Sequence, residues 1–209
     1  MKTNEKFIKS ADRVKDHGEV FTPKWVVDKM IDQPEIAAKV KSLTATFLEP
    51  SAGEGAFLVE ILDRKLKYAA QLSKSAHEFG NYALMALSTL YGIELLEDNV
   101  EMLVMNMKDT FTDNYRELMA DEYQEKPDQK VYNSAKVIIR ANMAQGDALK
   151  KIDASGNPII FSEWQPIGKT KVQRTEYTFE AIVNETLDLF PTRHFIPCKW
   201  TDIYKEEIE

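Results

Sequence analysis

The chain has 209 residues, of which 34 are acidic and 27 are basic, so its formal net charge is −7. This length suits one α/β domain that buries about 70% of its unfolded surface, and the negative charge argues against unaided binding to nucleic-acid phosphates. The single cysteine, Cys198, excludes an internal disulfide and indicates a reducing compartment.

The first 42 residues predict a helical cover. Residues 1–17 are polar and charged, lack the apolar core of a signal peptide, and predict a helix or frayed arm whose order depends on a ligand. Residues 22–31 predict a helix that Thr22 caps, with Pro23 at its first position and apolar residues three and four apart. We expect this helix to lie over the mouth of a pocket.

Residues 43–150 alternate between short apolar strands and longer helices, which predicts a Rossmann-like α/β fold with helices on both faces of the sheet. The expected elements are a strand at 43–48, helices at 56–71 and 74–87, a strand at 90–95, a helix at 98–119, a polar loop or helix end at 121–133, and a third strand or its approach within 137–144.

Residues 151–209 predict an extension of the same single domain. Residues 157–164 and 171–177 have the pattern of a β-hairpin that turns at Gly168-Lys169. The last thirty residues match no motif. No apolar run approaches the roughly 18 residues of a membrane span, so we expect a soluble, cytoplasmic protein.

The most informative stretch is residues 47–58, in which an apolar run ends at Glu49 and breaks into a turn with Gly53 and Gly55. Glycine tolerates positive φ and lets a ligand approach the backbone, with the N–H groups of the following helix start pointing outward. Glu49 suits an ammonium group, so the ligand is expected to be cationic at one end. A lysine neighbour that neutralises Glu49 is the structural alternative.

Two further acidic residues follow predicted strands. Glu94 lies 39 positions after Gly55, about twice the usual spacing of a ribose-binding acid, and the additional helix at 74–87 accounts for the difference. Asp147 follows the third strand and suits an adenine amino group. It also suits the cap of a helix beginning at Ala148.

These motifs, in this order, resemble the N6-adenine DNA methyltransferases of restriction–modification systems. Residues 49–58 resemble the family's first cofactor motif, D-P-A-C-G-S-G-x-F-L, and residues 18–23, Gly-Glu-Val-Phe-Thr-Pro, resemble the F-x-T-P element before it. Gly92-Ile93-Glu94 and Gly146-Asp147-Ala148-Leu149 resemble the next two motifs. The resemblance covers residues 18 to about 150.

The resemblance implies S-adenosylmethionine as cofactor and methyl transfer to adenine N6 as activity, with DNA reached through a partner subunit or a recognition domain outside this chain. The implied cofactor residues are Phe21, Thr22, Glu49, Pro50, Ser51, Ala52, Gly53, Gly55, Phe57, Glu94, Asp147 and Ala148.

The family's catalytic N-P-P-[YF] motif does not occur in the chain. The run from Phe179 to Asn184 has the shape of the family's F-D-x-I-x-G run, which precedes that motif at the end of the fourth strand, but it continues Glu185-Thr186-Leu187. Asn184 is the one candidate remnant of the motif. The missing motif puts methyl transfer in doubt, because the target base must be extruded and held by such a motif. A catalytically silent subunit of a DNA modification complex, a methyltransferase for RNA or another substrate, and a structural domain without a ligand therefore stay open.

The remaining chemistry-bearing residues predict no second site. His17, His77 and His194 are far apart and lack metal-ligand spacing, so no metal is expected. Cys198 is expected to be a small buried side chain and not a reactive thiol.

Overall fold

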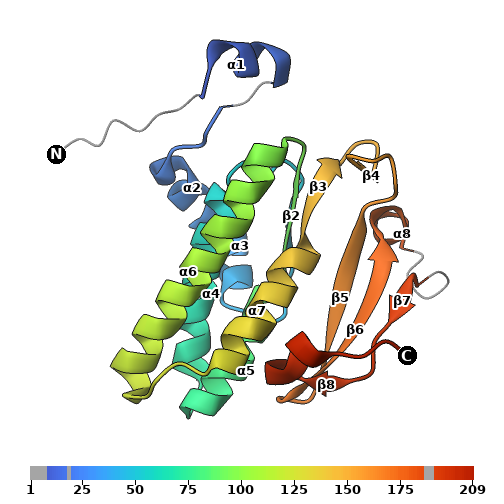
Figure 1. The fold of residues 1–209 in the computed structure, drawn as a ribbon. Helices are drawn as coiled ribbons and strands as arrows, with labels where there is room; N and C mark the ends of the chain where they lie inside the picture. The colour runs from blue at the N-terminus through green and yellow to red at the C-terminus, as the bar shows by residue number, and fades with distance from the viewer. Residues whose placement is uncertain (1–8, 18–19, 186–190) are drawn as a thin grey trace.

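The computed structural model describes residues 9–17, 20–185 and 191–209 and is a mixed α/β fold with two sheets and a layer of helices (Figure 1). None of the helices in the described part of the chain combines the length and apolar character needed to cross a bilayer. The elements are α1 (Ala11–His17), α2 (Lys24–Ile31), α3 (Pro34–Val40), β1 (Phe47–Glu49), α4 (Ala56–Leu72), α5 (Ala76–Leu87), β2 (Leu90–Glu94), α6 (Glu97–Tyr123), α7 (Gln129–Asn142), β3 (Met143–Asp147), β4 (Ile152–Asp153), β5 (Ile160–Ile167), β6 (Lys171–Thr178), α8 (Phe179–Val183), β7 (Arg193–His194), β8 (Cys198–Lys199) and the 3₁₀ helix η1 (Trp200–Lys205).

Strands β1, β2 and β3 form a parallel sheet in that order, and the short β4 joins β3 in antiparallel pairing. Glu49 lies opposite Gly92, and Glu94 lies opposite Gln145. Parallel strands end at a common edge, where ligands of open α/β sheets bind. The chain therefore brings Glu49, Glu94 and Asp147 to one edge of the sheet.

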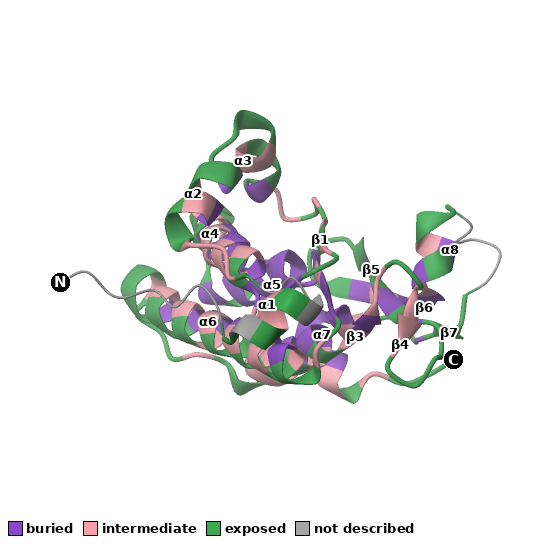
Figure 2. Cartoon of the chain, turned by 90° about the horizontal axis from the view of Figure 1, so that it is seen from above, coloured by how far each residue is buried: buried purple, intermediate pink, exposed green. Residues whose placement is uncertain are grey.

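Helices α4 and α6 pack against one face of this sheet. The approach is closest at Gly92, where an added Cβ would lie 2.9 Å from the Leu58 side chain on α4 and 3.2 Å from Leu103 on α6. Buried residues gather where these helices meet the strands (Figure 2). Glycine at this position lets both helices sit close to the strand.

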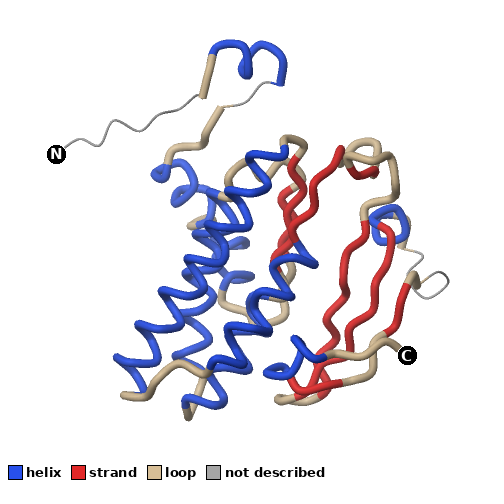
Figure 3. Tube along the Cα trace, in the orientation of Figure 1, coloured by secondary structure: helices blue, strands red, loops and turns tan. Residues whose placement is uncertain are grey.

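The opposite face of the sheet is covered by the β5–β6 hairpin and α8, and not by the helices that the sequence predicted. Tyr91 of β2 donates its hydroxyl hydrogen to the Ser162 carbonyl at 2.8 Å, and its ring meets Phe161 edge-on at 5.5 Å. Phe161 in turn meets Phe179 of α8. Figure 3 shows the parallel strands and the antiparallel strands as two separate groups. Of the described helices, the five-residue α8 lies on this face, and the β5–β6 hairpin takes the place of the longer helices that were expected there.

The third strand begins at the end of the segment, 137–144, that was expected to contain it or its approach. Residues 137–142 belong to α7, and β3 starts only at Met143. The Asp128 carboxylate caps α7 by accepting from the Lys130 N–H at 2.9 Å. Val131, Ile138 and Ile139 are buried at helical spacing. A short apolar run does not by itself distinguish a strand from a buried helix, and the cap at Asp128 was the missed signal.

The run that resembles the family's F-D-x-I-x-G run is also a helix. Residues 179–183 form α8, because the Thr178 hydroxyl accepts from the Ala181 N–H at 3.1 Å and starts a helical turn. Asn184 follows as an exposed C-cap residue. The predicted hairpin is confirmed, with β5 and β6 joined through Gly168 at φ 63°.

Two local predictions need correction. Helix α2 starts at Lys24, its N-cap is Pro23, and no side chain caps it, so Thr22 is not the cap. The Pro23 carbonyl instead accepts from the Val26 and Val27 N–H groups at 2.9 and 3.2 Å. Cys198 is half-buried instead of buried, and burial raises the pKa of its thiol to about 11.

Candidate cofactor site

The loop between β1 and α4 has the positive φ values that its glycines allow. Gly53 has φ 54° and Gly55 has φ 92°. An added Cβ at Gly55 would lie 2.6 Å from the Leu103 side chain, whereas nothing lies within 4 Å of one at Gly53. Gly55 is therefore required by packing against α6. Gly53 leaves space that a ligand can use.

Glu49 is a half-buried carboxylate at the end of β1. Burial raises its pKa, and a hydrogen bond from the Ser51 backbone opposes that rise. Among the described residues no cation forms an ion pair with Glu49, so the lysine neighbour considered from the sequence is not found there. A half-buried carboxylate without a cation is suited to binding one from a ligand.

Glu94 is 7% exposed and is oriented by three donors. Its carboxylate accepts from the backbone N–H of Gly53 at 2.8 Å and of Leu96 at 3.0 Å, and the Asn99 amide lies at 3.4 Å. A carboxylate has about four acceptor positions, so capacity for ligand hydroxyls remains. The hydrogen bond from Gly53 ties the second acidic strand end directly to the glycine loop.

Asp147 organises a turn, and the alternative in which it caps a helix beginning at Ala148 is not found. Its Oδ1 accepts from the backbone N–H of Leu149 at 3.0 Å and of Lys150 at 3.1 Å. These backbone bonds and the Lys150 side chain lower the Asp147 pKa. Oδ2 lies 3.1 Å from the Lys150 ammonium, which is itself largely exposed. The carboxylate therefore stays ionised and half-buried at the third strand end.

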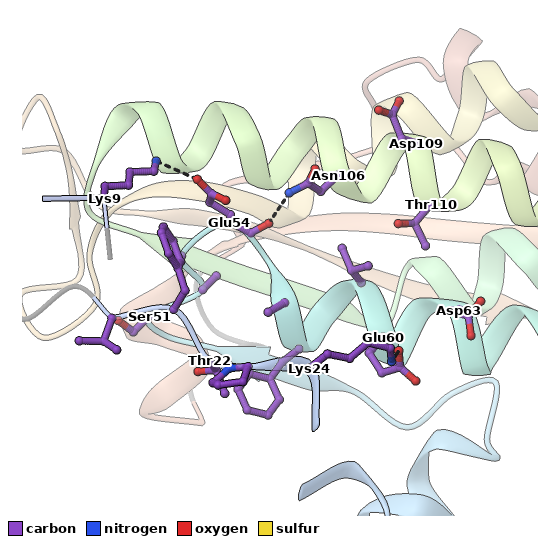
Figure 4. Close-up of a pocket in the computed structure, with 18 of the residues that line it drawn as sticks. Lys9, Thr22, Lys24, Ser51, Glu54, Glu60, Asp63, Asn106, Asp109 and Thr110 are labelled. Carbon is purple, nitrogen blue, oxygen red and sulfur yellow. Dashed lines mark hydrogen bonds and ion pairs between the residues drawn. The ribbon is translucent and has the colours of Figure 1, made fainter. Parts of the chain in front are cut away.

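A cavity of about 990 Å³ opens beside the glycine loop (Figure 4). It runs from the segment before α2, past the loop, and along the groove between α4 and α6. Of the expected cofactor residues, its lining includes Phe21, Thr22, Ser51, Ala52, Gly53 and Phe57. Its lining does not include Glu49, Pro50, Gly55, Glu94, Asp147, Ala148 or Asn184.

Two helix N-termini border this cavity without side-chain caps. Helix α2 follows Pro23 and α4 follows Gly55, and neither cap residue supplies a side-chain acceptor. Lys24 and Ala56, the first residues of the two helices, both line the cavity. Helix N-termini present free N–H groups and a partial positive charge, which favours an anionic group such as a carboxylate.

Two exposed leucines were missed by the sequence analysis. Leu95 is 52% exposed and Leu149 is 94% exposed, although both are large apolar side chains. Leu95 directly follows Glu94, and Leu149 lies two residues after Asp147. Neither leucine is among the residues that line the cavity, and both lie just past acidic strand ends at the sheet edge. That position in the sequence was the signal that could have found them.

Four carboxylates line the far part of the cavity, Glu60 and Asp63 of α4 and Asp109 and Asp113 of α6. Three of them are paired with cations: Glu60 with Lys24 and Arg64, Asp63 with Lys67, and Asp113 with Arg116. Figure 4 shows Glu60 beside Lys24.

Comparison of the chain with known protein families, with curated proteins and with solved structures gives no match. What the site binds therefore has to be inferred from its own residues.

Proposed function

We propose that the chain binds S-adenosylmethionine as a methyltransferase-type domain, in line with its resemblance to the N6-adenine DNA methyltransferases. The observation that carries the proposal is the arrangement at one sheet edge: a positive-φ glycine loop beside three carboxylates on adjacent parallel strands. Phosphate-binding loops do not need a carboxylate at the first strand end, whereas a sulfonium and ammonium ligand does.

Each part of such a ligand has a matching group at this edge. The Glu49 carboxylate suits the ammonium group, and the uncapped N-termini of α2 and α4 suit the carboxylate of the amino-acid part. Glu94 suits the ribose hydroxyls and Asp147 suits the adenine amino group. Leu95 and Leu149 suit the two faces of the adenine ring.

Methyl transfer to adenine N6 is the reaction that the resemblance implies. The N6 nitrogen would attack the sulfonium methyl carbon, so that an N–C bond forms, the S–C bond breaks, and N6 then loses a proton to water. The enzyme's contribution would be to position the two groups and to extrude the base. Restriction–modification or phage DNA modification would be the setting.

The placement of Asn184 favours a second candidate. Asn184 lies after α8 and outside the lining of the cavity, and the sequence contains no N-P-P-[YF] motif. A chain with a cofactor site but no acceptor-holding residues would work as a cofactor-binding subunit of a DNA modification complex. Transfer of labelled methyl to DNA or to RNA by the chain alone would exclude the silent subunit and identify the substrate.

Calorimetric titration with S-adenosylmethionine tests the cofactor assignment. We expect a micromolar Kd, about −8 kcal/mol, for the unaltered chain. Gly53→Ala should weaken binding by at least about tenfold, because its Cβ would project into the cavity. Gly168→Ala is the matched control, since Gly168 has a similar φ of 63° and the same open surroundings but lies in the β5–β6 turn.

Glu94→Gln supplies a second variant that preserves side-chain size. It should weaken binding because an amide replaces half of the acceptor capacity for ribose hydroxyls. A folded chain that does not bind S-adenosylmethionine would refute the proposal. Equal losses in Gly53→Ala and Gly168→Ala would show that backbone strain, and not the cavity, causes the effect.

A further inference from the structure

The N-terminal arm, residues 9–17, is attached to the candidate site by charged side chains. The Lys9 ammonium lies 2.8 Å from Glu54 in the glycine loop, 3.1 Å from Asp98 and 2.6 Å from the Asn99 side-chain oxygen. Arg13 forms a bidentate pair with Asp98 at 2.7 and 3.0 Å. Two cations one helical turn apart thus hold the arm to two parts of the site.

This contact reaches the acidic strand end behind it. Asn99 is 1% exposed, accepts from Lys9 and Arg13 with its oxygen, and places its amide 3.4 Å from Glu94. Glu94 in turn holds the Gly53 N–H. A continuous set of hydrogen bonds therefore connects the arm, the start of α6, the carboxylate expected to bind ribose, and the glycine loop.

The arm also borders the cavity. Lys9 is one of the lining residues and lies 5.7 Å from the centre of the Phe21 ring, which is another. Figure 1 shows α1 beyond the edge of the sheet at which β2 and β3 end, next to the segment that leads into α2. Lys9 is thus the residue by which the arm reaches the lining of the cavity beside the glycine loop.

We propose that residues 9–17 form a lid over the cofactor site, closed by the pairing of Lys9 and Arg13 with Glu54, Asp98 and Asn99, and opened for ligand exchange. The role of the lid in ligand exchange rests on the proposed S-adenosylmethionine site. The closed position of the arm rests on the ion pairs alone. Its contacts hold Asn99 and Glu94 in place when it is closed. When the lid opens, a ligand can enter or leave, and the contacts that hold Asn99 and Glu94 are lost.

The ion pairs are suited to a reversible closure. The side chains of Lys9, Glu54 and Arg13 are about one-quarter to one-third exposed and that of Asp98 is about half exposed. Pairs of this exposure are weak and are screened by salt. Hydrogen bonds from Arg13 and Lys9 hold the Asp98 pKa far below its usual range. Ionic strength, and not pH near neutrality, is therefore the variable that opens the lid.

The first test measures the lid without any ligand. A spin label at Lys15→Cys, in a Cys198→Ala background, reports the mobility of the arm. We expect its mobility to rise between about 0.05 and 1 M salt, over which the screening length falls to about 3 Å. A label at Lys136→Cys on α7 is the control and should not respond. A salt-independent arm, whether ordered or mobile, would overturn the lid.

The second test uses charge exchange and ligand kinetics. Asp98→Arg should free the label and speed dissociation of S-adenosylmethionine by about threefold to tenfold, and Arg13→Asp added to it should reverse both effects in part. Asp121→Lys, at the other end of α6, controls for net charge. Dissociation that stays fast in the double variant would show that Asp98 acts on the pocket directly and would overturn the lid.

The two tests also separate the lid from the proposed function. A chain that binds no S-adenosylmethionine refutes the function and the lid's role in exchanging that ligand. The label alone still decides whether the ion pairs close the arm.

Discussion

Buried charged side chains have different partners in the parallel strands and in the antiparallel C-terminal sheet. In the C-terminal sheet, Arg174 lies between Glu176 at 2.7 Å and Glu206, and its guanidinium stacks 4.3 Å from the centre of the Phe195 ring. At the end of the parallel strands, Glu49 lacks a described cation and Glu94 is held by backbone N–H groups and an amide. Glu176 and Glu206 share the Arg174 cation, whereas Glu49 and Glu94 leave a negative potential for a ligand and Asp147 is paired with Lys150.

The difference distinguishes carboxylates that stabilise the fold from carboxylates that are available to a ligand. A buried carboxylate with an arginine partner stabilises its own surroundings, whereas one without a cation costs free energy that a ligand can recover. Asn142 marks the boundary between the two regions. Its amide donates to the Ser88 and Leu90 carbonyls, and its oxygen accepts from the Trp164 ring nitrogen at 2.9 Å.

The largest expected effect comes from breaking the C-terminal charge cluster. Arg174→Met keeps much of the packing but leaves Glu176 and Glu206 buried without their cation, so it should cost about 3–5 kcal/mol of unfolding free energy. Urea denaturation measures this loss, and the affinity of the folded fraction for S-adenosylmethionine should not change. Arg193→Ala is the control, because Arg193 is half exposed and its pair with Glu176 is 3.6 Å long. Equal losses in both variants would contradict the assignment.

Lys65 is the reverse case, a buried cation that has no carboxylate partner among the described residues. It is fully buried in α4, and its ammonium donates to the Ser42 and Ala45 carbonyls at 2.6 and 3.0 Å. Burial lowers its pKa to about 8. The unfolded chain therefore binds more protons than the folded one between pH 8 and about 10.5.

Stability should accordingly rise with pH across this window, by about 2 kcal/mol relative to Lys65→Met. The contribution is fully present above the unfolded pKa and is lost as the pH falls through the folded pKa. Thermal unfolding of both proteins at pH 7.5 to 10.5 measures the difference. Parallel pH profiles would show that Lys65 is not desolvated.

Features of the fold and the site that depend on local sequence patterns were predicted better than those that depend on helix caps or on contacts between distant residues. The glycine loop, the three acidic strand ends and the β5–β6 hairpin depend on local chemistry, and the structure has them at the expected residues. Apolar pattern alone did not decide between helix and strand at residues 137–142 and 179–183, because caps at Asp128 and Thr178 make both segments helical. The Lys9 and Arg13 contacts join residues some 85 positions apart, which no local pattern reveals.

The smallest expected effect on stability is at Leu149. Because this side chain is 94% exposed, Leu149→Ser should change the unfolding free energy by less than about 0.5 kcal/mol. It should nevertheless weaken S-adenosylmethionine binding by about threefold to tenfold, since an apolar contact with the adenine ring is lost. Leu72→Ser, at the far end of α4, serves as the exposed-leucine control. Unchanged affinity in Leu149→Ser would remove this residue from the site.

The order of the strands along the chain also determines the order in which they can pair during folding. β5 and β6 are joined by a short turn, so their pairing closes a small loop and should form early. The pairing of β1 with β2 must wait for the intervening segment, which contains α4 and α5, and the pairing of β2 with β3 must wait for α6 and α7. We therefore expect the ligand-binding edge to be the last part of the molecule to assemble.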